Sequence, residues 1–471
     1  MDWLTKHAEA LSRQPFVAPP EIPRTALQRL TYDQHRDIRF RPERALWRDK
    51  CLPFEAQFFH LGWMFGQAVR VYDVADGKAR EVAFDPADFD YGKNHRRMPP
   101  SRNLGFAGFR LHYRLNRPDY LDEVVVFLGA SYFRAVGQNQ QYGITARGLL
   151  IDGNHGGKEE FPFFREFWLE RSLPSSREIV VHALLDSPSV SGAYTFHILP
   201  GPSTVMEVSA TLFARKTIEK LGAAPLTSMY LFGRKDVRFD DFRPEVHDSD
   251  GLSLASGSGE FLWRPLANPS KGQVSVFVDE NPGGYGLLQR DRAFASYEDL
   301  ELRYEQRPSL WVEPLERWGK GAVYLLELPS DLEYNDNVVA YWVPEKPFLA
   351  GESRRIQYRL YWSLEPPDRF EGGRVARTSS GKCDVPGARQ FVVDFDQGVL
   401  AAIAEGTPVD ADVTVSQGRL RNLVLHRNPA TKGYRVFFDV IPTRYKLIEM
   451  RCFLKAGTTR LTETWSYQWA P

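Results

Sequence analysis

Short runs of β-branched and aromatic residues recur along most of this chain, and Gly, Pro, Asn and Asp separate them at short intervals. Runs of this composition predict strands, and the residues between them predict tight turns. The clearest runs are Val124–Leu128, Glu178–Leu185, Ala193–Leu199, Thr204–Phe213 and Val274–Val278. This rhythm predicts an all-β fold built as an antiparallel β-sandwich of many strands.

Helical patterns are few. Residues 2–13 have apolar side chains at helical spacing, which predicts a short amphipathic helix that ends at Pro15. Two further short helices are expected around Pro162–Trp168 and Tyr297–Tyr304.

The sequence changes character after about residue 365, where two segments rich in Pro and Gly indicate a connector. The residues beyond it form short alternating strands over roughly 100 residues, which is typical of an immunoglobulin-like sandwich. The strand candidates are Gln390–Phe395, Ala411–Val415, Tyr434–Val440, Leu447–Phe453 and Thr462–Tyr467. We therefore expect two domains, a β-sandwich over 14–365 and an immunoglobulin-like domain over 376–471.

The charge balance excludes some partners. The 471 residues carry 60 Lys and Arg and 60 Asp and Glu, so the formal net charge is zero. Nucleic acids and anionic membranes favour basic surfaces, and we expect neither as a partner. No apolar run approaches the roughly 18 residues that a membrane span needs, so no transmembrane segment is expected. The N-terminus lacks the basic and apolar regions of a signal peptide, which leaves a cytosolic protein or one whose leader has been removed.

The three cysteines, Cys51, Cys383 and Cys452, form no CxxC pair. Zinc and thioredoxin-type chemistry are therefore not expected, although a disulfide between two of the three stays open. The glycine-rich stretch at 281–290 lacks the Lys-Ser/Thr of a P-loop and does not match a dinucleotide fingerprint. We expect no metal and no cofactor.

An acidic loop holds Asp331, Glu333 and Asp336 between two strand-like runs, Ala322–Leu328 and Val338–Trp342. Clustered carboxyls repel one another, so one can keep its proton near neutral pH and act as an acid. The alternative is a solvated hairpin turn rich in Asp and Asn.

A second acidic segment, Arg243–Leu252, carries Asp248 and Asp250. It is too short for a calcium loop of the EF-hand type. One of its carboxylates could remove a proton from water, as the second carboxylate does in sugar hydrolysis. The alternative is an Asx turn that leads into the strand Leu252–Ala255. Whether Asp248 and Asp336 face one cleft depends on the fold.

Aromatic residues near the acidic segments are candidates for binding a saccharide. Trp263 and Arg264 lie together in one run, and Tyr341 and Trp342 follow the acidic loop. Their flat apolar faces could stack on sugar rings, although core packing is the alternative for each of them.

Segments spread along nearly the whole chain match a known family in order. Among them are Ala130–Gly137, Tyr142–Leu149, Glu160–Trp168, Arg243–Leu252, Asn335–Trp342 and Glu463–Tyr467. The chain resembles the periplasmic osmoregulated glucan biosynthesis proteins of Gram-negative bacteria, the OpgG/OpgD (MdoG/MdoD) family.

The resemblance implies a large N-terminal β-sandwich of the galactose-mutarotase-like supersandwich type and a smaller immunoglobulin-like domain. It also implies a periplasmic location and a β-1,2-glucan substrate, which is hydrolysed or transferred with inversion at the anomeric carbon. Asp336 matches the family's acid, with Glu333 beside it, and Asp248 matches the base. Tyr304 would line the path that the proton of the attacking water follows.

Two alternatives stay open under this resemblance. A non-catalytic glucan-binding or scaffolding protein that assists a membrane glucan synthase would use the same aromatic residues. The sequence also does not distinguish hydrolysis from transglycosylation, because it does not reveal how well the site excludes water. An inverting pair has carboxyls roughly 6.5–9.5 Å apart, and a wider gap needs a relay.

Overall fold

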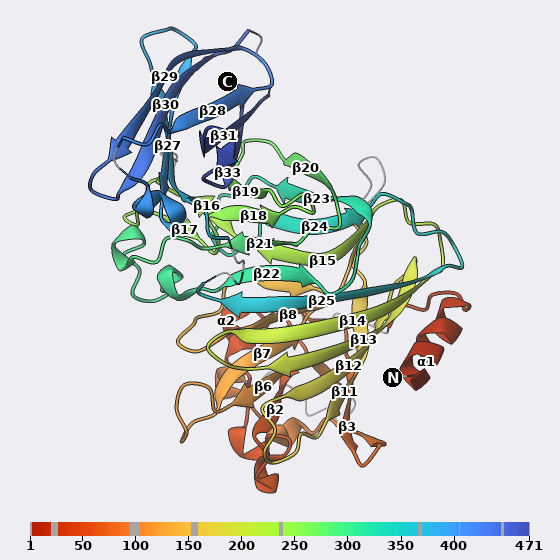
Figure 1. The fold of residues 1–471 in the computed structure, drawn as a ribbon. Coiled ribbons are helices and arrows are strands. Elements are labelled where there is room, and N and C mark those ends of the chain that lie inside the picture. Colours follow the sequence, from red (N-terminus) through yellow and green to blue (C-terminus); the bar gives the residue numbers. More distant parts are fainter. Residues whose placement is uncertain are drawn as a thin grey trace.

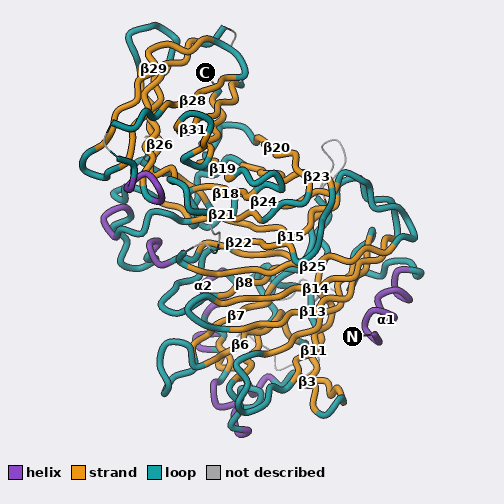
Figure 2. Tube along the Cα trace, in the orientation of Figure 1, coloured by secondary structure: helices purple, strands orange, loops and turns teal. Residues whose placement is uncertain are grey.

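Strands are the dominant regular structure of the computed structural model, and the few helices lie at its periphery (Figures 1 and 2). The structure describes residues 2–19, 27–94, 104–151, 159–234, 239–365, 367, 370–404, 406–443 and 447–470. The prediction of an all-β fold is confirmed.

Two large sheets form the main sandwich. The ten-stranded sheet runs in the order β2 (Phe54–His60), β6 (Phe106–Tyr113), β7 (Asp122–Leu128), β8 (Tyr132–Ala135), β9 (Thr145–Arg147), β15 (Leu221–Ser228), β24 (Val338–Pro344), β23 (Lys320–Glu327) and β20 (Gln273–Glu280), with β10 (Leu150–Ile151) beside β15. The 15-stranded sheet runs in the order β28 (Asp410–Val415), β31 (Ile448–Ala456), β33 (Thr464–Trp469), β19 (Phe261–Pro265), β18 (Gly251–Ala255), β21 (Gly284–Leu288), β22 (Ser309–Pro314), β25 (Ser353–Ser363), β14 (Thr204–Ala214), β13 (Val190–Leu199), β12 (Ile179–Asp186), β11 (Phe163–Glu170), β3 (Arg70–Ala75) and β4 (Lys78–Glu81), with β32 (Thr459–Arg460) beside β31.

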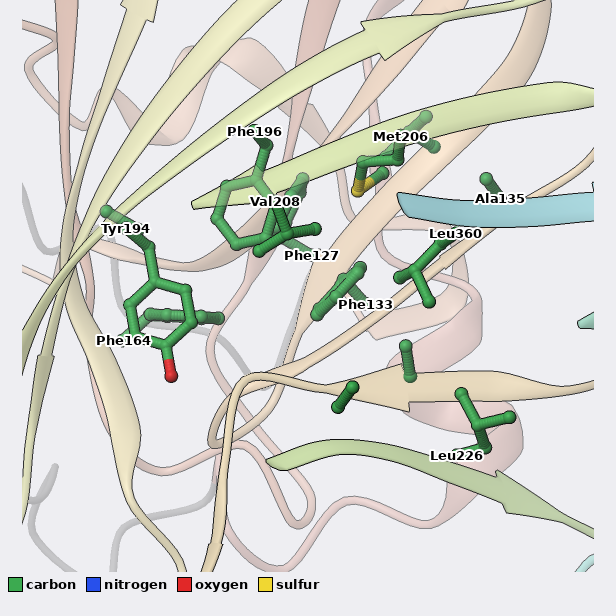
Figure 3. Packing of buried hydrophobic residues seen from close by; sticks show 14 of the residues in the cluster. Phe127, Phe133, Ala135, Phe164, Tyr194, Phe196, Met206, Val208, Leu226 and Leu360 are labelled. Atoms are coloured by element: carbon green, nitrogen blue, oxygen red, sulfur yellow. The ribbon is translucent and has the colours of Figure 1, made fainter. Parts of the chain in front are cut away.

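The main core lies between these sheets and is rich in phenylalanine (Figure 3). Phe127 of β7 and Phe133 of β8 meet Phe196 of β13, with ring centroids 5.1 and 5.2 Å from it. Aromatic pairs at such distances add to the stabilisation that burial alone provides. Inward-facing side chains alternate with outward-facing ones along these strands, as the sequence pattern predicts.

The C-terminal sandwich shares one sheet with the main sandwich. β33 runs parallel to β19, with Trp465 opposite Trp263, so the 15-stranded sheet continues from one sandwich into the other. A four-stranded sheet faces this continuation and contains β26 (Arg374–Lys382), β27 (Arg389–Asp396), β30 (Gly433–Ile441) and β29 (Arg419–Asn428). Phe438, Met450 and Trp465 belong to the second core between them. All five strand candidates expected in this region are present.

The N-terminal helix is confirmed as α1 (Asp2–Ser12). Its buried residues Leu4 and Ala8 pack against Trp168, Leu184 and Ala193. These partners lie on the face of the 15-stranded sheet that points away from the main core. A second helix, α2 (Tyr32–Arg36), begins at a capping box in which Thr31 and Gln34 bind each other's backbone N–H groups.

The predictions of the two other helices are wrong. Residues 163–170 form strand β11. Residues 297–303 lie between two 3₁₀ turns, Phe294–Ser296 and Tyr304–Gln306, and Glu298 and Arg303 have positive φ angles that interrupt a helix.

Two small pairs of strands complete the fold, β1 (Arg39–Phe40) with β5 (Phe89–Asp90), and β16 (Tyr230–Phe232) with β17 (Val246–His247). The disulfide that the sequence left open is not formed, since all three cysteines are free thiols. Within the described residues, no helix has both the length and the hydropathy that crossing a bilayer requires.

Candidate active site

The acidic loop connects β23 to β24, as the sequence predicts, and Asn337 fixes its end. The Asn337 side chain accepts a hydrogen bond from the backbone N–H of Tyr230 (2.8 Å) and donates to the carbonyls of Tyr230 (3.0 Å) and Leu328 (2.9 Å). Its own N–H donates to the carbonyl of Ser228 (3.1 Å). Asn337 is buried, and these bonds hold the neighbouring Asp336 against the segment 228–230.

The second acidic segment is attached to the same three residues. The backbone N–H of Asp248 donates to the carbonyl of Met229 (2.8 Å), and the hydroxyls of Ser249 and Ser228 are 2.6 Å apart. Segment 228–230 therefore carries both acidic segments, which are far apart in the sequence. Asp248 is close enough to Asp336 for its charge to act on that carboxyl.

Burial, and after it the negative charge of Asp248, raise the pKa of Asp336 to about 6, against the opposing effect of Arg147, Arg134 and Arg307. Water still reaches the Asp336 residue, which has an exposed surface. Among the described residues, none forms a hydrogen bond or ion pair with its side chain. The carboxyl thus lies among many protein atoms without a direct hydrogen-bond or ion-pair partner among them.

Asp248 differs from Asp336 because an arginine neutralises it. Arg307 Nη1 donates to Asp248 Oδ1, and both side chains are largely buried. Burial opposes the charge on Arg307, but Asp248 and Tyr304 outweigh this effect, so the pKa of Arg307 is raised. The guanidinium also stacks on the Tyr304 ring, 4.0 Å from its centroid. Asp248 therefore has a direct cationic partner, which Asp336 lacks among the described residues.

Glu333 and Tyr304 lie next to this pair. The Tyr304 hydroxyl donates to Glu333 Oε2 over 3.4 Å, a long hydrogen bond, and Arg243 Nη2 lies 2.8 Å from the same oxygen. Burial raises the pKa of Tyr304 above its usual value, so its hydroxyl keeps its proton. Arg243 also pairs with Asp241 and Asp299, which fixes its position. The structure thus brings Asp336, Asp248, Glu333 and Tyr304 into one neighbourhood.

The family model described as "Periplasmic glucan biosynthesis protein, MdoG" matches residues 1–469 of this chain. The chain belongs to this family. This result confirms the resemblance that the sequence segments indicated.

Relatives of the MdoG family align over almost the full chain. A "Glucans biosynthesis protein G" of Shewanella baltica (strain OS195) is 46% identical over 474 residues, which cover 99% of this chain and 86% of that protein. The protein of the same description from Rhodopseudomonas palustris (strain BisA53) is 48% identical over 464 residues, covering 98% and 91%. Among solved structures, an α-galactosidase of Geobacillus stearothermophilus matches 54% of this chain with a TM-score of 0.27 and 9% identity, which is too low to support an argument.

Two arginines of this MdoG-family site were not singled out from the sequence. Arg307 follows the 3₁₀ turn at Tyr304–Gln306 and belongs to no motif. Arg147 ends β9, lies inside the matching segment Tyr142–Leu149, and donates from Nε to Thr227 Oγ1 (2.8 Å). Only the match over Tyr142–Leu149 could have pointed to Arg147. No signal in a single sequence pointed to Arg307.

The four expected sugar-binding residues are not gathered at the carboxylates. Trp263 and Arg264 lie on β19, both buried. Trp263 stacks under Arg290, 3.5 Å from the ring centroid, and lines a cavity of about 470 Å³ at the junction of the two sandwiches. Arg264 pairs with Glu449 of the C-terminal sandwich (3.2 Å). Their burial and partners give both residues a packing role here.

Tyr341 and Trp342 point to opposite faces of β24. Tyr341 stacks on Tyr324 (centroids 5.6 Å apart) in a small cluster on the outer face of the sheet. Trp342 belongs to the main core. Trp342 is 1% exposed, so almost none of its ring is open to a sugar.

One group of side chains within the described residues has the spacing of metal ligands, namely Cys383, Asp384 and Asp439, whose ligand atoms lie within 4.8 Å of one another. Asp439 already accepts hydrogen bonds from Gln390 (3.2 Å) and Asn422 (2.7 Å). Its oxygens are therefore committed to structural bonds, and we assign no metal to this group.

Proposed function

We propose that this chain is a glycoside hydrolase or transglycosylase that acts on β-1,2-glucan with inversion, in the periplasm, within the biosynthesis of periplasmic glucans. The family description and the name of its relatives, "Glucans biosynthesis protein G", support the role in glucan biosynthesis. The β-1,2 linkage and the inverting mechanism come from the resemblance of the acidic segments.

The observation that carries the proposal is the contrast between Asp336 and Asp248. Burial raises the pKa of Asp336 to about 6, whereas Arg307 binds Asp248 directly. A carboxyl with a raised pKa beside a second carboxyl that is bound to a cation is an arrangement suited to general acid–base catalysis. Asp336 is therefore the acid and Asp248 the base.

The reaction follows from these roles. Asp336 donates its proton to the glycosidic oxygen as the bond from that oxygen to the anomeric carbon breaks. A water or sugar hydroxyl attacks that carbon from the opposite face, and its proton passes to Asp248. Arg307 occupies Oδ1 of Asp248. Since no described residue forms a hydrogen bond with Oδ2, that oxygen is available to accept the proton, directly or through intervening hydroxyls such as that of Tyr304.

Attack by water gives hydrolysis, and attack by a sugar hydroxyl gives a branched or cyclised product. Linear β-1,2-glucan incubated with the protein should yield shorter or cyclic chains. Mass spectrometry separates the two outcomes, because a cyclic product is one water lighter than the linear chain of equal length.

The decisive variant is Asp336→Asn, and Asp331→Asn, an exposed carboxyl of the same loop, is its control. We expect Asp336→Asn to keep the fold and to lose at least ~10³-fold in kcat, in the range that general-acid catalysis contributes, while Asp331→Asn stays within a few-fold of the wild type. Wild-type turnover by Asp336→Asn would refute the assignment. Tight binding without any change in chain length would instead support a scaffold that assists a membrane glucan synthase.

A further inference from the structure

Strand β20 forms one edge of the ten-stranded sheet and exposes a row of valines. Among the strands of the described residues it pairs with β23 alone, in an unbroken register from Gln273 opposite Glu327 to Glu280 opposite Lys320. Val274, Val276 and Val278 are 49%, 47% and 85% exposed, and they share the outer face because strand side chains alternate. The described residues provide no backbone hydrogen bonds along the other side of this strand.

Four other edge strands, β4, β2, β26 and β29, are protected in ways that β20 is not. β4 has four residues, three of them charged. β2 is buried, and its Ala56 exchanges backbone hydrogen bonds with Leu46 (2.8 and 3.3 Å). β26 and β29 each contain an irregularity that shifts their register. Short length, charge, cover and bulges are the means by which proteins prevent edge pairing. β20 has eight residues, no bulge, no proline and no lysine.

The valine row is the outermost part of a larger apolar surface. Val274, Val276 and Val278 lie opposite Leu326, Tyr324 and Ala322 of β23. Tyr324 and Leu326 are partly buried and pack against the apolar cluster of Leu150, Val339, Tyr341 and Val343. The apolar face of this sheet thus reaches solvent at β20, whose outer side pairs with no described strand. Covering the row would bury apolar area and satisfy the open backbone groups at the same time.

We propose that β20 pairs with β20 of a second copy of this chain, so that the ten-stranded sheets of two protomers join about a two-fold axis. Antiparallel pairing with Val276 opposite its own symmetry mate places Val274 opposite Val278 of the second copy, and Val278 opposite its Val274. All three valines of each strand then meet apolar partners across the interface.

The symmetry of the valine row favours a second copy as the occupant. Val274, Val276 and Val278 are evenly spaced about Val276, so an antiparallel copy of the same strand presents a valine opposite each of them. A strand that is self-complementary in this way fits the isologous interface of a two-fold dimer.

The oligomeric state tests the proposal directly. Sedimentation equilibrium of the full chain should give twice the chain mass of 53.9 kDa, and Val276→Lys should raise the dimer dissociation constant at least ~100-fold, because it places like charges opposite each other at the axis. Val424→Lys is the matched control, since Val424 is 40% exposed on the edge strand β29. It should leave the dimer intact. A wild type that stays monomeric at 100 µM, or a Val276→Lys variant that remains dimeric, would overturn the proposal.

Cross-linking tests the register without relying on a disruptive charge. In a Cys51→Ser, Cys383→Ser background, Val276→Cys should form a covalent dimer under mild oxidation. Residues directly opposite in an antiparallel pair have Cα atoms about 4.5–5.5 Å apart, within the range that a disulfide spans. Val424→Cys in the same background should not cross-link. A dimer in which Val276→Cys fails to cross-link would place the interface elsewhere and refute the pairing of β20.

Discussion

Two neighbouring residues of the acidic loop, Asp336 and Asn337, differ in how their side chains are used. Asn337 uses its whole side chain for hydrogen bonds that fix the backbone, whereas Asp336 makes none with the described residues. A rigid loop that carries one unsatisfied carboxyl keeps that carboxyl available for a substrate. This division explains why the residue with the raised pKa stands directly beside the residue that anchors the loop.

The raised pKa of Asp336 predicts a pH-dependent cost to stability. An unfolded aspartate has a pKa near 3.8, and the folded value is about 6, so the folded state holds the proton more tightly. Asp336 therefore lowers the unfolding free energy progressively as pH rises from about 4 to 6, and the loss is complete above pH 6. Because Asp336 contacts water, we expect less than about 1 kcal/mol.

Calorimetry tests the direction of this pH dependence of stability. The Tm of Asp336→Asn minus that of the wild type should grow between pH 4 and 6.5 and then stay level. Asp331→Asn serves as the control and should not follow this course. A difference that is the same at every pH would mean that the pKa of Asp336 is not raised.

Asn337→Ala should damage both stability and activity. The substitution removes the three hydrogen bonds that the buried Asn337 side chain makes with Tyr230 and Leu328, and the loss of a partner by a buried polar group costs about 1–3 kcal/mol. We expect the unfolding free energy to fall by about 2–3 kcal/mol in denaturant titrations. We also expect kcat on β-1,2-glucan to fall at least ~10-fold, because Asp336 loses its fixed position. Asn335→Ala, an exposed asparagine of the same loop, should change neither quantity by much.

The sequence identified the two acidic segments because several carboxyls cluster in loops between strand-like runs, although a polar turn also has this composition, and the match of these segments to a family gave the individual residues. It did not identify Arg307, whose importance depends on contacts with Asp248 and Tyr304 that only the fold creates. The sequence also did not reveal the burial of Trp263 and Trp342, for a related reason. Composition does not distinguish a tryptophan on a binding surface from one in a core, and both are buried here.

At the level of single elements, strands with regular alternation were predicted well and the bulged strand β11 was not. In residues 163–168, aromatic side chains recur at a spacing that resembles a helix. The register of β11 against β12 shifts between Phe164 and Glu166. This bulge lets Phe164 and Phe167 both enter the main core, while Trp168 faces α1. An extra residue in a strand breaks the period of two on which strand prediction depends.

The helix α1 offers a test at this scale, because few contacts hold it. Leu4 and Ala8 are its buried residues, and Arg215 binds the carbonyl of Leu11 (2.8 Å) near its C-terminal end. Leu4→Ala removes a contact worth about 2–5 kcal/mol, more than so short a helix can lose and stay docked. We expect proteolysis and hydrogen exchange within residues 2–12 to increase, with little change in the Tm of the sandwich.

The exposed Lys6 provides the control, since Lys6→Ala keeps the buried face of α1 intact. Cooperative unfolding of the whole chain in Leu4→Ala, without prior release of the helix, would contradict this prediction.

Across the whole molecule, the two sandwiches are joined by a continuous sheet and by one buried ion pair. Arg290 follows β21 of the main sandwich and binds Glu463 through two hydrogen bonds, of 2.6 and 3.0 Å. Glu463 is fully buried and also accepts the backbone N–H of Val375 in β26 (2.7 Å). The sequence predicted two sandwiches but gave no sign of this junction, because β19 and β33 are some 200 positions apart in the chain.

This junction predicts that the two sandwiches unfold as one cooperative unit only while the pair is intact. Removing one partner of a buried pair leaves an uncompensated charge, so Glu463→Ala should cost about 3–5 kcal/mol. The lost free energy belongs to the contact between the sandwiches, so it weakens their coupling. Calorimetry should therefore show two unfolding transitions in place of the single transition of the wild type, and the C-terminal sandwich should unfold first. Asp384→Ala removes an exposed partner of Arg421 within that sandwich and should cost less than about 1 kcal/mol. A single transition at unchanged Tm in Glu463→Ala would mean that the shared sheet and the other ion pairs across the junction, such as Arg264–Glu449 (3.2 Å), couple the two sandwiches without it.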